Sequence, residues 1–131
     1  MVVIDTTVWV AYFRGFATPQ TAWLDLEIER QRLGLTDLNL CEVLQGVRDE
    51  REAAQVRRNL LRFAVVSTGG TELAVASAHH YRALRAAGRR VRGPIDCLIA
   101  TACLLKGHSL LHNDHNFDHF ERLLGLSVIH P

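Results

Sequence analysis

Five short apolar runs recur along the chain, and each has the length of a strand buried in a sheet. They are MVVID (1–5), LGLT (33–36), AVVST (64–68), SLLHN (109–113) and LSVIH (126–130). None alternates strictly between apolar and polar residues, and continuously apolar strands are typical of parallel sheets covered on both faces. The pattern therefore predicts a mostly parallel sheet of about five strands.

Segments with helical spacing separate these runs. They cover 6–15, 19–32, 38–50, a stretch from Arg51 to the third apolar run, 71–88 and 94–107. Pro19 and Pro94 stand at first-turn positions, Asp37 is a candidate cap, and Gly15 and Gly107 follow helix ends. Strands alternating with helices predict an α/β fold, a three-layer α/β/α sandwich, in which residues 1–131 form a single domain.

Composition narrows the function only slightly. The 131 residues are 48% apolar, which indicates a globular protein, and the formal net charge of +1 makes no strong statement about partners. All but one of the 15 basic residues are arginine, a weak preference for phosphate ligands. Three cysteines, no signal-type segment and no long apolar stretch lead us to expect a cytoplasmic protein with neither disulfides nor a membrane span.

Four carboxylates are placed where strands end or helices begin. Asp5 and Asp114 follow strands, whereas Glu42 lies in the first or second turn, and Asp96 in the first turn, of apolar helices. Ligands of open parallel sheets bind outside the carboxyl ends of the strands, so all four side chains reach one rim. Buried acids that converge repel one another unless a cation neutralises them, and hard oxygen ligands favour Mg²⁺ or Mn²⁺. The chemistry that this indicates is phosphodiester hydrolysis.

Each acid also has a simpler interpretation. Asp96 would interact favourably with the helix dipole, and Asp5 would cap the helix that follows it. Thr6 or Thr7 is a second candidate for that cap. Taken singly these structural roles are the more common, and only the shared rim of all four acids favours a metal site.

The motifs that carry these acids resemble those of a known family. VVIDTTVWVAYFRG with Asp5, LNLCEVLQGVRDE with Glu42, GPIDCLIATACLLKG with Asp96 and LLHNDHNFDHF with Asp114 are similar, in order and spacing, to the four motifs of PIN-domain proteins. More narrowly they resemble VapC-type toxins of bacterial type II toxin–antitoxin systems. The resemblance spans the whole chain.

The resemblance implies a PIN-like fold and a metal-dependent endoribonuclease. Asp5, Glu42, Asp96 and Asp114 would be its catalytic residues and would hold Mg²⁺ or Mn²⁺, and Thr6 would support them through its hydroxyl. A VapB-like antitoxin would silence the enzyme, and the toxin would pair as a homodimer within a heterotetramer or larger complex.

The fourth motif departs from the family pattern at two positions. His112 stands where Ser or Thr is frequent, and Asn116 stands where a second Asp is frequent. Asp118 is therefore a rival to Asp114 for the fourth acid. A catalytically idle PIN-like binding domain remains an alternative, as does a PIN nuclease acting on DNA or in RNA processing.

Two further groups are candidates for binding. His112, His115 and His119 have spacings that would suit a zinc site on a helix, but the segment lacks a long helical pattern, so surface histidines are favoured. His112 would then support Asp114 by contacting RNA phosphate. The arginines just before the Asp96 helix are candidate RNA contacts, with a solvated charged face as the alternative. They are Arg85, Arg89, Arg90 and Arg92.

Overall fold

The computed structural model describes residues 1–131, and its centre is a parallel sheet of four strands. These strands are β1 (Val2–Ile4), β2 (Leu33–Thr36), β3 (Ala64–Val66) and β4 (Ser109–Leu111). They lie in the order β3-β2-β1-β4, and every neighbouring pair is parallel. The predicted parallel α/β sheet is confirmed.

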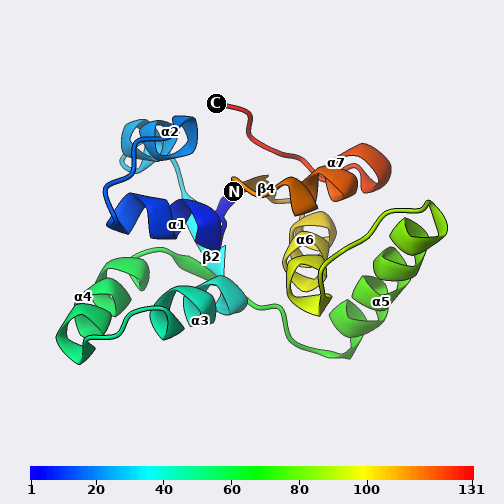
Figure 1. Ribbon diagram of the computed structural model, residues 1–131, viewed down its shortest axis with the longest axis horizontal. Helices are drawn as coiled ribbons and strands as arrows, with labels where there is room; N and C mark the ends of the chain where they lie inside the picture. Colours follow the sequence, from blue (N-terminus) through cyan, green and yellow to red (C-terminus); the bar gives the residue numbers. More distant parts are fainter.

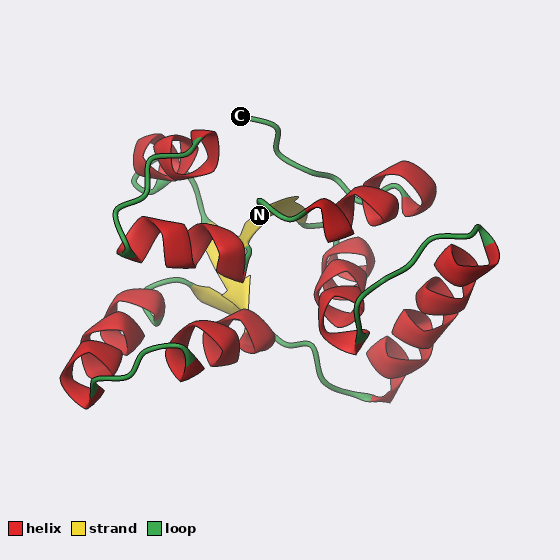
Figure 2. Ribbon diagram, viewed as in Figure 1, coloured by secondary structure: helices red, strands yellow, loops and turns green.

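Seven α-helices and one short 3₁₀ helix surround the sheet. They are α1 (Thr6–Phe13), α2 (Pro19–Glu27), α3 (Asp37–Gln45), α4 (Glu50–Leu60), α5 (Thr71–Ala86), α6 (Pro94–Lys106), η1 (His115–Phe117) and α7 (Asp118–Leu124). Figures 1 and 2 show α1 to α4 on one side of the strands and α5 to α7 on the other. None of the helices is long and apolar enough to span a bilayer.

Successive side chains of a strand point to opposite faces of the sheet, so each strand contributes apolar residues to both helical layers. Val2 and Ile4 of β1 pack with α1 to α4, whereas Val3 between them packs with α5 to α7. In β4, Leu110 and Leu111 face the two layers in the same way. The predicted three layers are confirmed, with one apolar core on each side of the sheet.

The predicted fifth strand is reduced to a single bridge. Val128 pairs with Leu110 of β4, and the segment 126–130 forms no longer ladder. Its two backbone hydrogen bonds to β4 both use Leu110, from Leu110 N to Ser127 O at 2.8 Å and from Ile129 N to Leu110 O at 3.0 Å. Because β4 is only three residues long, it offers little more edge than this bridge uses.

Three helix predictions need correction. Thr36, and not Asp37, caps α3, because the Thr36 hydroxyl accepts the Asn39 N–H at 3.0 Å. Asp37 instead accepts the backbone N–H of Thr68, which follows β3, at 3.1 Å. Residues 46–49 separate α3 from α4, and the second helix ends at Glu27 instead of continuing to residue 32.

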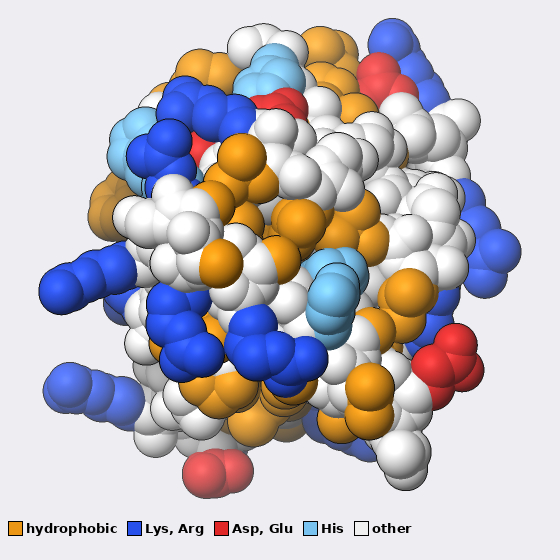
Figure 3. Space-filling model, turned by 90° about the vertical axis from the view of Figure 1, so that its right-hand side faces the viewer, with side chains coloured by type: hydrophobic (Ala, Val, Ile, Leu, Met, Phe, Trp, Pro, Cys, Tyr) orange, Lys and Arg blue, Asp and Glu red, His pale blue; other side chains and the backbone are white.

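The face formed by α5 and α6 exposes apolar side chains among basic ones (Figure 3). Val75 of α5 is 65% exposed and Ile95 of α6 is 37% exposed. A pocket of about 420 Å³ lies between these helices, and its walls include Tyr81, Arg82 and Leu98.

Candidate active site

A pocket of about 340 Å³ lies at the edge of the sheet where the strands end. Its walls bring together the four predicted acids, which come from four separate elements of the fold. The lining residues are Asp5, Thr6, Thr7, Glu42, Arg92, Gly93, Ile95, Asp96 and Asp114. Parallel strands end at one edge, so residues more than 100 positions apart meet there.

Asp5 is the most buried of the four acids, with 3% of its surface exposed. It caps α1, and its Oδ2 accepts the Thr7 N–H at 3.0 Å and the Thr7 hydroxyl at 2.6 Å. Asn39 Nδ2 donates to the other oxygen at 3.2 Å. Burial raises the pKa of Asp5 to about 6 against the opposing Thr7 bonds, and the charges of Asp96 and Glu42 add to that increase. The cap role and the pocket position therefore belong to the same side chain.

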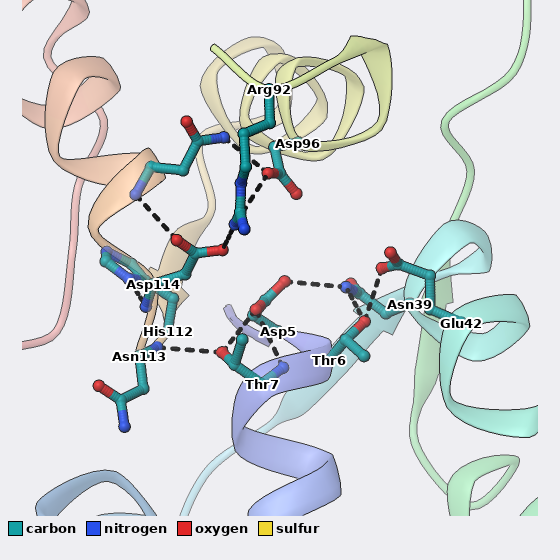
Figure 4. A network of polar contacts seen from close by, with 11 residues as sticks. Asp5, Thr6, Thr7, Asn39, Glu42, Arg92, Asp96, His112, Asn113 and Asp114 are labelled. Atoms are coloured by element: carbon teal, nitrogen blue, oxygen red, sulfur yellow. Dashed lines mark hydrogen bonds and ion pairs between the residues drawn. The ribbon is translucent and has the colours of Figure 1, made fainter. Parts of the chain in front are cut away.

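Asp96 lies in the first turn of α6 (Figure 4). Asn116 Nδ2 donates to Asp96 Oδ2 at 2.6 Å. Burial raises the pKa of Asp96 and the Asp114 charge adds to it, while the Asn116 bond and Arg92 act in the opposite direction. The residue that departs from the family pattern thus holds one of the acids in place.

Asp114 caps η1 after β4, and its backbone contacts His112. Its Oδ1 accepts the Asn116 N–H at 2.9 Å, and its own N–H donates to His112 Nδ1 at 3.1 Å. His112 is only 8% exposed and packs against Phe117 with 5.0 Å between ring centroids. Burial lowers the pKa of His112, so the neutral ring is favoured. The expectation of a surface histidine is wrong for His112, which lies behind Asp114 and outside the pocket walls.

Glu42 is held at the opposite side of the pocket. The Thr6 hydroxyl donates to Glu42 Oε1 at 2.7 Å and accepts from Asn39 Nδ2 at 3.1 Å. Asn39 therefore joins Thr6 to Asp5, and it is itself fixed because its Oδ1 accepts the Thr36 N–H at 3.0 Å. Thr6 was expected to support the acids through its hydroxyl, and in the structure that hydroxyl contacts Glu42.

Only one of the four candidate arginines reaches the acids. Arg92 pairs with Asp114 and lies 3.9 Å from Asp96. Arg85 instead lies over the Tyr81 ring, 5.8 Å from its centroid, while Arg89 and Arg90 are exposed and do not line the pocket. The arrangement separates Arg92 from the rest of the basic segment.

Comparison with known proteins assigns the family. The family model of the PIN domain matches residues 2–123. The chain belongs to the PIN domain family. Two relatives of this PIN domain are VapC ribonuclease Mb1587 of Mycobacterium bovis and ribonuclease VapC11 of Mycobacterium tuberculosis. Each is 32% identical over 132 residues, covering 98% of this chain and 97% of the relative.

A solved structure supports the fold of this PIN domain independently of sequence. VapBC2 from Rickettsia felis, bound to a DNA fragment from its promoter, contains a chain that matches with a TM-score of 0.78. The match covers 98% of both chains at 16% identity, so it bears on the fold alone.

The pocket of the PIN domain has the donor set of a divalent-cation site. Its walls carry four carboxylates and neither thiol nor imidazole, as hard cations prefer. In the side-chain arrangement described, no three His, Cys, Asp or Glu residues are positioned to hold a metal ion together. Protein groups contact these acids instead. Thr6 donates a hydrogen bond to Glu42, and Arg92 forms ion pairs with Asp96 and Asp114. To hold a cation, these carboxylates would have to exchange their protein donors for the metal.

Sequence reasoning missed two amides of the site, Asn39 and Asn116, as functional candidates. Asn39 lies three residues before Glu42, a spacing that places both on one helix face. Its pairing with Thr36 matches a capping pattern and gives no sign of a second role. Only the folded chain shows that Nδ2 of each amide faces a carboxylate.

Proposed function

We propose that this PIN domain is a Mg²⁺- or Mn²⁺-dependent endoribonuclease and the toxin of a VapBC-type pair in the cytoplasm. The observation that carries the proposal is the meeting of four carboxylates in one pocket, where burial raises the pKa of Asp5 and Asp96. Relatives named VapC ribonucleases, 32% identical across nearly the whole chain, support the activity. A bound divalent cation would activate water and stabilise charge at the scissile phosphate.

The residues of the chain hold the acids in place before RNA binds. Thr7 and Asn39 fix both oxygens of Asp5, Thr6 fixes Glu42, and Asn116 orients Asp96 through its side chain. Asn116 also donates its backbone N–H to Asp114. Preorganised groups of this kind need not reorganise during the reaction, which is where electrostatic catalysis gains most. We also propose that Arg92 at the pocket, together with Arg85, Arg89 and Arg90 on the surface outside it, contacts RNA phosphates.

The proposed partners follow from the same family. Several solved structures with this fold are of VapBC proteins, and one of them, from Mycobacterium tuberculosis, is of the VapBC family of toxin–antitoxin systems. We propose a VapB-like antitoxin for this chain and a homodimer of the toxin within the complex. The exposed apolar side chains of the α5–α6 face provide surface for such contacts.

Cleavage of total RNA by the purified, antitoxin-free chain tests the enzymatic proposal. Discrete fragments are expected in Mg²⁺ or Mn²⁺ and none in EDTA. Cleavage that persists in EDTA would contradict metal dependence, and folded protein that neither cleaves RNA nor binds Mn²⁺ would support the idle domain. Growth arrest on expression, relieved by a co-expressed neighbouring small protein, would distinguish a toxin from an RNA-processing enzyme.

Substituting Asp114 and Asp118 separately identifies the fourth acid. Asp114 lines the pocket, whereas Asp118 begins α7 and its Oδ2 lies 3.1 Å from His115 Nδ1. We expect Asp114→Asn to reduce the rate of RNA cleavage about 10²-fold, as loss of a charge-stabilising group does. Asp118→Asn should leave the rate within about twofold, because an exposed pair of this kind contributes little. The reverse ranking would transfer the fourth position to Asp118.

Thr6→Val tests whether the Thr6 hydroxyl positions Glu42. Valine keeps the shape of the side chain but removes the donor at 2.7 Å from Glu42 and the acceptor for Asn39. The rate of RNA cleavage should fall about tenfold, within the range for a hydrogen bond to a charged group. Thr6→Ser should retain most of the rate. Equal rates for all three proteins would assign Thr6 a local helical role only.

A further inference from the structure

Arg92 is a basic residue among the walls of an acidic pocket. It belongs to the segment between α5 and α6, and its guanidinium extends toward Asp114 and Asp96 (Figure 4). Nη2 pairs with Oδ2 of Asp114 and lies 3.9 Å from Oδ2 of Asp96. No other lining residue is basic. One guanidinium therefore stands between two of the four acids.

A divalent cation and Arg92 compete for the same two carboxylates. A cation held by Asp96 and Asp114 would use the same two carboxylates that pair with Arg92, and two positive groups so close together repel each other. While Arg92 is in place, no three acids are positioned to hold a metal ion together. A cation bound by both Asp96 and Asp114 would therefore take the place of the guanidinium.

The side chain of Arg92 is free to move while its backbone is held. The side chain is 71% exposed, and its only polar partners are these two acids. The neighbouring Val91 is 8% exposed and packs in the core with α5 and α6. The Arg89 N–H also donates to Leu84 O at 2.9 Å. Release of Arg92 thus requires rotation of one exposed side chain and no change in the core.

We propose that Arg92 is a built-in counter-ion of the metal site, which neutralises Asp96 and Asp114 in the metal-free protein and is displaced when a divalent cation binds. This inference rests on the proposed function, since it assumes that these acids bind metal. Its consequence is a lower affinity for metal than the four acids alone would give. The ion pairs are largely exposed, so the effect is moderate.

Direct Mn²⁺ binding to the antitoxin-free full chain tests the proposal without reference to activity. Free Mn²⁺ is measured by EPR at constant ionic strength for wild type, Arg92→Gln and Arg89→Gln. The Kd should fall about three- to tenfold in Arg92→Gln, as expected for the loss of two exposed ion pairs. Arg89→Gln removes the same charge from the same segment but no contact with the acids, so its Kd should change less than about twofold.

The outcomes separate this proposal from the one on which it rests. If wild type binds Mn²⁺ and the two variants have equal Kd values, or Arg92→Gln binds more weakly, Arg92 is not a competitor and the metal site stands. If none of the three binds Mn²⁺, the metal site and the counter-ion both fail. Thermal unfolding of Arg89→Gln should match wild type, and that of Arg92→Gln should occur only slightly lower, because the ion pairs that it loses are largely exposed.

A second measurement follows Arg92 in the wild-type protein. The Nε–Hε NMR signal of Arg92, assigned by its loss in Arg92→Gln, should shift when diamagnetic Mg²⁺ is added. The corresponding Arg89 signal should stay in place. Mg²⁺ binding that leaves the Arg92 signal unmoved would show that the guanidinium keeps its carboxylate partners, which contradicts displacement.

Discussion

Asp5→Asn is expected to abolish RNA cleavage and to leave the metal-free protein at least as stable as wild type. Loss of activity follows because a neutral amide cannot provide the negative charge that the proposed divalent cation would need from the most buried of the four acids. A reduction of about 10²-fold or more in the cleavage rate is expected from losing several kcal/mol of charge stabilisation.

The expected stability follows from the buried charge. Burial raises the pKa of Asp5 from 3.8 to about 6, so the folded protein binds this proton more tightly than the unfolded chain does. The free energy of unfolding therefore falls as pH rises between these two values, by about 3 kcal/mol in total. Asparagine avoids this cost and still caps α1, but it loses the bond from Asn39, worth about 1 kcal/mol. The net gain above pH 6 is about 1 to 2 kcal/mol.

Thermal unfolding in EDTA from pH 4 to pH 8 measures this difference. The advantage of Asp5→Asn should grow with pH and level off above about pH 7. Asp49→Asn is a matched control, because Asp49 caps α4 in the same manner but is exposed and lies outside the pocket. The control should keep both cleavage and stability. Wild-type cleavage by Asp5→Asn would remove Asp5 from the proposed catalytic set.

Phe117→Ala is expected to lower the free energy of unfolding by about 3–5 kcal/mol, the range for truncating a buried aromatic residue. Phe117 is fully buried and packs between His112, at 5.0 Å, and Phe120, at 6.3 Å between centroids. It also lies at the end of η1, the turn that Asp114 caps. A cavity there would loosen the support of the fourth acid as well as the core.

Urea denaturation measures this change, with Leu123→Ala as the control. Leu123 is in the adjacent helix α7 and is 47% exposed, so its truncation should change the free energy of unfolding by less than about 1 kcal/mol. A loss below about 1 kcal/mol for Phe117→Ala would mean that neighbouring side chains refill the site. RNA cleavage per folded molecule should also fall in Phe117→Ala and not in Leu123→Ala.

The sequence predicted the layers and the meeting of the acids because both depend on simple periodicities. Short apolar strands between helices leave a parallel sheet as the stable arrangement, and such a sheet gathers strand ends at one edge. Asp5, Glu42, Asp96 and Asp114 could therefore be placed at one rim without coordinates. Their catalytic roles stay a prediction.

The local sequence pattern did not predict features that depend on contacts between distant parts of the chain. The sequence did not predict helix α7, because the apolar pattern of Phe117, Phe120 and Leu124 is short and histidines interrupt it. The burial of His112 depends on packing against Phe117, and the contact of Arg92 with two acids depends on how the 87–93 segment turns toward the pocket. Contacts between side chains from distant positions produce no periodic pattern in the sequence.

The four acids are divided evenly between the two helical layers. Asp5 and Glu42 come with α1 and α3, whereas Asp96 and Asp114 come with α6 and η1 on the other side of the sheet. In a nascent or locally unfolded copy with only one layer formed, only two of the four carboxylates are in their places in the pocket. For an enzyme proposed to cleave the RNA of its own cell, the site is therefore incomplete until both layers have folded. This delays activity before any antitoxin binds.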